Sequence, residues 1–210
     1  MYARPVDARR YAIDQVSEHC DLSERLKVLP PSSSSRGLFF RSIENVLGRA
    51  GKMERFEALF PERISGLRWY PTSEFLIRLT VGAALLQGPE HVHAGMFEIG
   101  RHNVSAVMNS LLGKMMLRFL ARDPRKLLQQ GAAGRRQTCN FGRWELTFPD
   151  DDSAIVSMTE EYLYIESYML GAARGTFDAV GVPVSVQATL TDRFTGTHTL
   201  RWGPSCEDSL

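Results

Sequence analysis

The sequence predicts an α+β domain in which N-terminal helices, one of them long and central, precede a four-stranded antiparallel sheet. Three observations support this class. Apolar residues recur with helical spacing through the first two-thirds of the chain. After Gly131 the spacing changes to every second residue, which is typical of strands. One more helical stretch interrupts the alternating segments, so the expected order is strand, strand, helix, strand, strand.

The N-terminal part of the chain is the least regular. Residues 1–35 show no sustained apolar stripe and end in a Pro- and Ser-rich run at residues 30–35. We expect an N-terminal arm with a flexible connector there, a single α+β domain over residues 36–203, and a tail over residues 204–210. The first helices of that domain are predicted after Gly37, after Lys52 and after Pro71.

The central helix is predicted between Ala94 and Arg122, because its apolar residues follow the i, i+3, i+4, i+7 series without an error. These residues are Val104, Val107, Met108, Leu111, Leu112, Met115, Met116, Phe119 and Leu120. Asp123 and Pro124 end this helix and begin a short one that closes at Gly131. At ~1.5 Å per residue, the central helix would be roughly 40 Å long.

The alternating segments predict the sheet. Strands are expected around Trp144 to Phe148 and over residues 153–159, with a Pro-Asp turn between them. A helix is expected over residues 166–180, followed by strands at residues 182–190 and 197–202. Either of the last two strands would leave an unpaired edge, so we expect a homodimer.

Composition restricts the class of protein. The 210 residues are 43% hydrophobic and 23% charged with a formal net charge of +1, which is ordinary for a globular domain and predicts no nucleic-acid partner. The chain contains no apolar run near the ~20 residues that a membrane span needs, and its N-terminus lacks an apolar leader. Three scattered cysteines indicate free thiols in a reducing cytoplasm.

Five short motifs occur together in one known family. They are Arg36-Gly37-Leu38-Phe39-Phe40, Tyr70-Pro71, Ile99-Gly100-Arg101, Asp123-Pro124-Arg125-Lys126-Leu127-Leu128 and Leu200-Arg201-Trp202. In this order and at this spacing the chain, over roughly residues 22–203, resembles a domain of unknown function found as many paralogues in myxobacteria. The resemblance implies an intracellular myxobacterial protein and brings no established activity.

A looser resemblance concerns the architecture. Helices followed by a strand-strand-helix-strand-strand unit are similar to the vinyl-reductase-like, haem-nitric-oxide-binding and Bet3-type proteins, several of which hold an apolar ligand. The Tyr-x-Ser-x-Arg signature of the haem proteins has no match here, and the nearest segment, residues 168–172, lacks the serine and the arginine. Haem is therefore not expected.

Methionines on the predicted central helix suggest an apolar ligand site. The soft side chains of that helix either fill the core or form one wall of a cavity. In the second case the expected ligand-binding residues are Tyr70, Arg78, Phe97, His102, Met108, Met115 and Tyr168.

Other candidate sites are weaker. His91 and His93 stand one residue apart without further metal-binding spacing, so surface histidines are expected and a metal is not. Cys139 follows Arg135 and Arg136, which could lower a thiol pKa, but no base accompanies it and a structural cysteine is expected. Catalytic residues are not predicted. Lys114, Arg118 and Arg122 recur at i+4 and form either a solvated helix face or a docking strip for an acidic protein partner.

Together these patterns predict a non-catalytic intracellular sensor or adaptor in a regulatory role, which binds an apolar small molecule or a protein partner. Two alternatives stay open: an interaction scaffold without a ligand, and an enzyme on the same fold.

Overall fold

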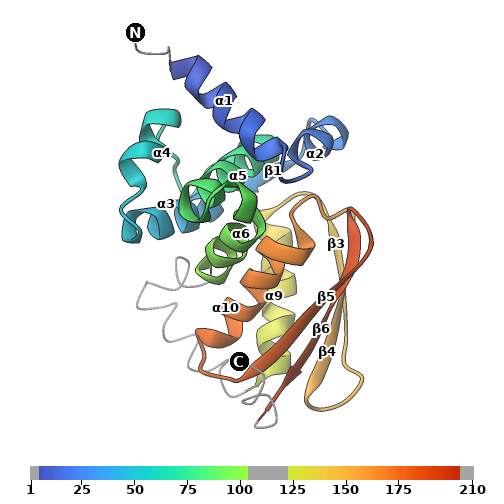
Figure 1. Cartoon of the computed structure of the whole chain (residues 1–210). Coiled ribbons are helices and arrows are strands. Elements are labelled where there is room, and N and C mark those ends of the chain that lie inside the picture. Colours follow the sequence, from blue (N-terminus) through green and yellow to red (C-terminus); the bar gives the residue numbers. More distant parts are fainter. Residues whose placement is uncertain (1–4, 104–122, 204–210) are drawn as a thin grey trace. The chain divides into compact units, whose positions relative to one another are not determined.

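The computed structural model describes residues 5–103 and 123–203 of the chain (Figure 1). It divides into two compact units, residues 1–99 and residues 100–210. The first is helical with a small two-stranded sheet, and the second carries a four-stranded antiparallel sheet with helices. The predicted α+β class is confirmed.

The first unit is built around α5 (Thr72–Gln87). Its side chains Phe75, Leu76 and Leu79 are fully buried, because a hydrophobic segment bounded by Pro71 and Gly88 folds as a helix with neighbours on several sides. The other elements of this unit are α1 (Pro5–Ser17), α2 (Leu22–Val28), β1 (Ser34–Arg36), α3 (Leu38–Arg49), α4 (Met53–Leu59), β2 (Trp69–Pro71), η1 (Pro89–His91) and the greater part of α6 (Val92–Arg101).

The described residues 5–35 of the segment predicted as an arm and connector include regular structure. They contain α1, α2 and the first residues of β1, and they bury Val16 and Leu22. Strand β1 pairs antiparallel with β2, so that Ser35 lies opposite Tyr70. The hydroxyl groups of Ser35 and Thr72 lie 3.0 Å apart in a buried hydrogen bond. Residues of the serine-rich run therefore form part of β1 and pair with β2.

The second unit follows the predicted order of elements. Asp123 caps α9 (Pro124–Thr138) by accepting a hydrogen bond from the Lys126 backbone N–H at 3.1 Å, with proline at the start of the helix. The remaining elements are β3 (Arg143–Thr147), β4 (Ser153–Thr159), the π-helical turn η2 (Ile165–Met169), α10 (Leu170–Asp178), β5 (Val184–Asp192) and β6 (Thr195–Trp202). The predicted strand-strand-helix-strand-strand unit is confirmed.

The four strands are ordered β3-β4-β6-β5. Strand β6 pairs with β4 on one side and with β5 on the other, so Thr197 lies opposite both Ser157 and Thr189. Of the two strands that the sequence offers as alternative edges, residues 197–202 lie inside the sheet, because the last strand inserts between its two neighbours, and β5 lies at an edge. The edges of the described sheet are β3 and β5.

One face of this sheet carries the core of the second unit. Figure 1 shows α9 and α10 on the same side of the sheet. The buried side chains that pack there are Ala154, Val156, Met158, Ile165, Phe177, Val184, Leu200 and Trp202. The partly buried Leu128 of α9 packs against them, as the helical spacing of that segment predicts.

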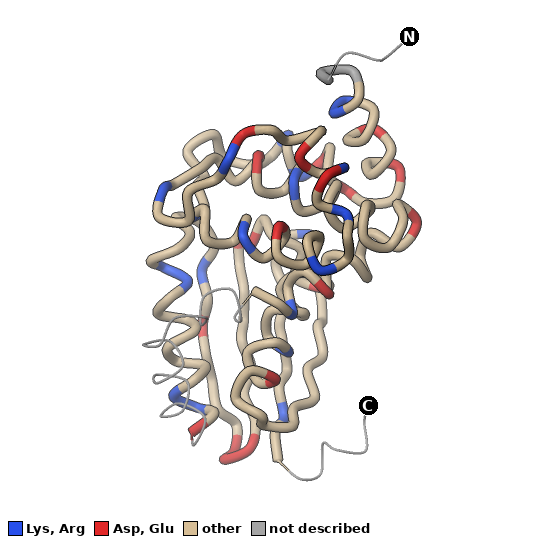
Figure 2. The backbone as a smooth tube through the Cα atoms, turned by 90° about the vertical axis from the view of Figure 1, so that its left-hand side faces the viewer, with Lys and Arg blue, Asp and Glu red and all other residues tan. Residues whose placement is uncertain are grey.

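The predicted central helix is described only in its first part. α6 ends at Arg101, and residues 104–120, with their apolar stripe, lie outside the described residues. No helix in the described part of the chain is long and apolar enough to span a membrane. Figure 2 shows basic and acidic residues interspersed along the described chain, consistent with the formal net charge of +1.

Candidate functional site

The residues predicted to bind a ligand fall into three groups. Tyr70, Arg78 and Phe97 belong to the first unit, while His102 and Tyr168 belong to the second. Met108 and Met115 lie outside the described residues, as do the predicted partner-binding residues Lys114, Arg118 and Arg122. The proposed grouping of these side chains in one site therefore stays a prediction.

Two of these residues have contacts within their own unit. Arg78 is 2% exposed, and its guanidinium donates to Glu74 at 2.7 Å and to the Glu62 carboxylate at 3.2 Å. The Tyr70 hydroxyl accepts a hydrogen bond from the Ser65 backbone N–H at 2.8 Å. Both side chains thus stabilise the local structure of the first unit.

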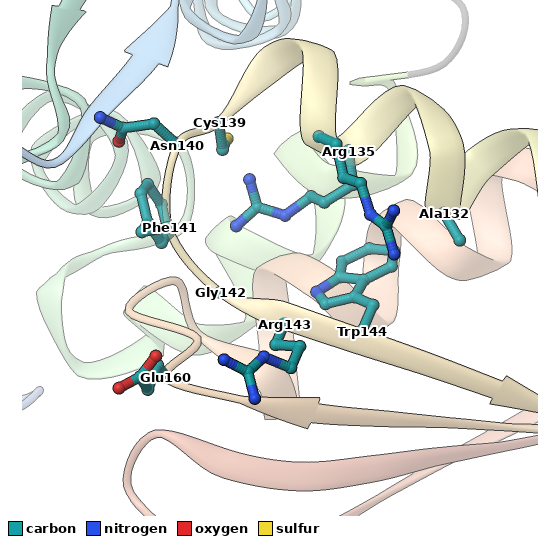
Figure 3. A pocket seen from close by; sticks show the side chains of 10 residues that line it. Ala132, Arg135, Cys139, Asn140, Phe141, Gly142, Arg143, Trp144 and Glu160 are labelled. Carbon is teal, nitrogen blue, oxygen red and sulfur yellow. The ribbon is translucent and has the colours of Figure 1, made fainter.

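A pocket of about 470 Å³ lies in the second unit, where the end of α9 leads through residues 139–142 into β3. Figure 3 shows Phe141 and Trp144 on either side of it, with Arg143 and Glu160 near the start of the strand. The lining residues come from the last turns of α9, the connecting loop, β3 and the residue after β4: Ala132, Arg135, Arg136, Cys139, Asn140, Phe141, Gly142, Arg143, Trp144 and Glu160. The volume is in the range of small-molecule sites.

The pocket is built on a buried ion pair. Arg135 is 6% exposed, and its Nη2 donates to both carboxylate oxygens of Glu161, at 2.7 and 2.8 Å. Glu161 is fully buried and also accepts hydrogen bonds from Trp144 Nε1 at 2.9 Å and from the Leu163 backbone N–H at 3.1 Å. Because a buried carboxylate needs compensating donors, this network holds the helix end, β3 and the loop after β4 together.

Local backbone geometry brings the pair together. Glu160 is the one non-glycine residue with positive φ (53°) in the described chain, and it turns the backbone after β4 so that Glu161 follows in the interior. Gly142 has φ +75°, and a β-carbon there would lie 3.1 Å from Glu161 Oε2. Both the conformation and the limited space therefore favour glycine at this position.

Charge and aromatic contacts define the chemistry of Arg135. Burial is the largest single influence and lowers its pKa, but the charge and hydrogen bonds of Glu161, with Cys139 and Tyr168, together raise the pKa of Arg135, so the guanidinium stays charged. Its central carbon lies 4.7 Å from the ring centre of Phe141 and 5.5 Å from that of Trp144. Its Nη1 is buried and has no hydrogen-bond partner among the described residues.

The rim of the pocket is basic. Arg136 and Arg143 are exposed, and Glu160 is the one carboxylate among the lining residues. Cys139 is buried there at the end of α9. Within the described residues, no three His, Cys, Asp or Glu side chains converge on a position for a metal ion.

The sequence pattern does not indicate this site. Arginines in the last turn of a helix usually lie in solvent and complement the helix dipole, so Arg135 resembled its exposed neighbour Arg136. Glu161 lies 26 residues further along the chain, outside any periodic segment. The one available signal was the cluster of Arg135, Arg136 and Cys139 before a strand.

Solved structures with a similar fold are H-NOX proteins. The Fe(II) unliganded H-NOX protein from K. algicida has a TM-score of 0.62 and 13% identity, covering 80% of this chain and 96% of that chain. An oxygen-binding H-NOX domain related to soluble guanylate cyclases has a TM-score of 0.58 and 14% identity, covering 79% and 92%. A third structure, described by the modulation of haem redox potential through porphyrin distortion, has a TM-score of 0.52 and 15% identity, covering 79% and 96%. The chain has an H-NOX-like fold.

These neighbours correct the expectation that haem and metal are absent from this protein. The haem expectation depended on a missing Tyr-x-Ser-x-Arg signature and the metal expectation on the spacing of His91 and His93, yet the similar structures are described with Fe(II) and haem. The similar structures share only 13–15% of their residues with this chain, so the absence of one short signature is not sufficient to exclude haem.

No curated protein matches the chain in sequence. One family model matches residues 29–203, and its description is a protein of unknown function, DUF2378. This range agrees with the resemblance that the five motifs indicate over roughly residues 22–203. The chain belongs to the DUF2378 family.

Proposed function

We propose that this chain is a non-catalytic, cytoplasmic sensor domain whose regulatory output changes when a small molecule binds. The H-NOX-like fold, shared over 80% of the chain, is the observation that carries the proposal. One similar domain is described as oxygen-binding and related to soluble guanylate cyclases. Since a fold alone does not determine function, the proposal must be tested on a ligand and on a residue that would hold it.

Haem is the ligand that we propose. Protein side chains that hold haem iron are histidine, cysteine, methionine or tyrosine, and histidine is the common proximal ligand. When bound, haem supplies an iron atom that can take up a diatomic gas. The histidines of the chain differ in burial and bonding, which allows one of them to be selected.

His102 is the histidine that fits this role. His198 is buried in the sheet, where its Nε2 donates to the Ile165 carbonyl at 2.8 Å, and His19, His91 and His93 are exposed. His102 is half-buried directly after α6. The next residue, Asn103, is 8% exposed, and its Oδ1 has no hydrogen-bond partner among the described residues. A half-buried imidazole beside an unsatisfied buried amide supports a polar ligand environment at this end of α6.

Absorption spectroscopy tests the proposal. The full chain is produced with a haem supply, or incubated with hemin after purification, and we expect a Soret band that shifts when nitric oxide is added. His102→Ala should lose the band. His93→Ala is the matched control, because His93 is an exposed histidine of α6, the helix that His102 follows.

Each result is decisive for one part of the proposal. A folded wild-type protein without a Soret band after hemin incubation would exclude haem, and native mass spectrometry would then separate another retained ligand from a scaffold without one. A Soret band that persists in His102→Ala would keep the haem sensor and remove His102 as the iron ligand.

Two interaction predictions stay open beside the ligand. A homodimer is still expected, because β3 and β5 are unpaired at the edges of the described sheet. Light scattering that gives a monomer mass over a wide concentration range would contradict it. An acidic partner that docks on Lys114, Arg118 and Arg122 should be recovered by wild type and lost after reversal of Lys114 and Arg118 to Glu.

A further inference from the structure

We infer that the pocket at the end of α9 binds a small monocarboxylate that carries a flat apolar group. This inference does not rest on the haem proposal, and neither depends on the other. Its floor is Arg135, its walls are Phe141 and Trp144, and its rim carries Arg136, Arg143 and Glu160.

The floor supplies unused hydrogen-bond donors. Arg135 Nε and Nη2 are both bonded to Glu161, whereas Nη1 has no partner among the described residues. Leaving a buried charged donor unsatisfied is unfavourable, so an acceptor that reaches Nη1 gains more than it would at an exposed arginine. A carboxylate oxygen is such an acceptor.

The charges favour a ligand with one negative charge. Glu161 neutralises the charge of Arg135, so the net charge of the pocket depends on the residues of its rim. Arg136 and Arg143 provide two positive charges there against one negative charge from Glu160. A single carboxylate complements this balance, while a polyphosphate would face Glu160 without enough arginines.

The walls favour a flat apolar group. Phe141 and Trp144 are half-buried and therefore keep part of their ring surface accessible. Figure 3 shows these two side chains flanking the space. Aromatic surfaces of this kind pack against planar groups, and the volume of about 470 Å³ accommodates a ring with one substituent.

The test uses benzoate as the probe and benzyl alcohol as its uncharged match. Binding is followed by calorimetry and by the indole N–H resonance of Trp144, which is identified by its loss in Trp144→Phe. This N–H donates to Glu161, so it reports on the pocket floor. We expect saturable benzoate binding that shifts the resonance, and at least tenfold weaker binding of benzyl alcohol.

The variants remove rim charges and leave the buried pair intact. Arg136→Gln with Arg143→Gln should weaken benzoate binding at least tenfold, while the fold is retained because both side chains are exposed. Arg201→Gln is the matched control, since Arg201 is an exposed arginine of the same sheet outside the pocket. It should bind benzoate like the wild type.

Several results would overturn the inference. Equal binding of benzoate and benzyl alcohol would indicate an apolar pocket without anion preference, and equal weakening by Arg201→Gln would indicate bulk charge. Inorganic phosphate that binds where benzoate does not would exclude the flat carboxylate. A folded protein that shows no saturable binding would indicate that water alone satisfies Nη1. None of these outcomes bears on the Soret band, so the two proposals can fail separately.

Discussion

The first unit buries Arg25 and Arg78 and the second unit buries Arg135, and the guanidinium groups of Arg78 and Arg135 are bonded differently. In the first unit, Arg78 is 2% exposed, and all three of its guanidinium nitrogens donate, to Glu74 and to the carbonyl and carboxylate of Glu62. In the second unit, Arg135 is 6% exposed, and among the described residues its guanidinium donates only to Glu161, through two of its nitrogens. Both guanidinium groups lie over an aromatic ring, at 4.8 Å from Phe60 and at 4.7 Å from Phe141.

The difference distinguishes Arg78, whose three guanidinium nitrogens are all bonded, from Arg135, whose Nη1 has no hydrogen-bond partner among the described residues. Arg78 is held by two carboxylates that both reach solvent, since the side chains of Glu74 and Glu62 are 23% and 65% exposed. Glu161 is fully buried and reaches no solvent. The carboxylate partners of Arg78 can therefore be rehydrated when an ion pair is lost, whereas Glu161 has no solvent contact of its own.

The largest expected effect comes from removing the charge of Glu161. Glu161→Gln leaves the Arg135 charge buried without its counterion, and breaking a buried pair in this way costs about 3–5 kcal/mol. We expect a correspondingly lower urea midpoint for the loss of secondary structure. A midpoint equal to that of the wild type would show that water reaches the pair and would remove the contrast between the two arginines.

The next effect concerns the helix contact inside the second unit. A β-carbon on Gly175 of α10 would collide with the backbone carbonyl of Arg101, which cannot move aside as a side chain can. Gly175→Ala should therefore destabilise the protein by about 1–3 kcal/mol, as overpacking does in general, and should lower the melting temperature.

Gly134→Ala is the matched control on α9, because nothing lies within 4 Å of a β-carbon there. Alanine is the better helix former, so this variant should be neutral or more stable by up to about 1 kcal/mol. Equal melting temperatures for the two variants would contradict the close approach of α10 to the end of α6.

A third prediction concerns pH. Burial lowers the pKa of His198 in the sheet, although its hydrogen bond to Ile165 and the charge of Glu161 oppose this. Below its ordinary value of about 6.5 the unfolded chain then binds more protons than the folded chain, so stability falls as the pH drops from about 6.5 towards the lowered pKa. The slope reaches at most about 1.4 kcal/mol per pH unit.

His198→Gln should flatten this part of the stability profile, because glutamine stays neutral and can still donate to the Ile165 carbonyl. Burial raises the pKa of Glu44 in the first unit from 4.5, so the wild type loses stability as the pH rises above 4.5. Glu44→Gln should remove this loss, and its effect on the pH slope is therefore opposite in sign to that of His198→Gln. Urea unfolding between pH 4.5 and 7.5 measures both. An unchanged slope in His198→Gln would contradict the assignment.

The sequence predicted those features that depend on local pattern. Alternation around Val186 and Leu200 indicated two strands, and Asp123 followed by Pro124 indicated the start of α9. The order of strands in the sheet was not predictable in this way. Insertion of β6 between β4 and β5 depends on pairings between residues that are distant in the chain, and the alternation of one strand does not name its neighbours.

The candidate site was hidden for the same reason. Arg135 and Glu161 each have an ordinary local context, a helix end and a loop, and only tertiary structure brings them within 2.7 Å. The pairing of β1 with β2 is a second example. Three-residue strands are too short for a periodic signal, so Ser34–Arg36 resembled a connector.

The smallest expected effect tests the other side of the comparison. Glu62→Gln removes a carboxylate that is 65% exposed and lies 3.2 Å from Arg78 Nη2. Because Glu74 stays bonded to Arg78 Nε at 2.7 Å and an exposed ion pair contributes little, the cost should be below about 1 kcal/mol. Glu74→Gln should cost more, since Glu74 is 23% exposed and pairs with both Arg78 and Arg9. Urea unfolding of the two variants beside Glu161→Gln gives the ranking Glu161, Glu74, Glu62. A Glu62→Gln protein as unstable as Glu161→Gln would mean that solvent access does not distinguish the two arginines, and that Arg78 depends on its counterions as strictly as Arg135 does.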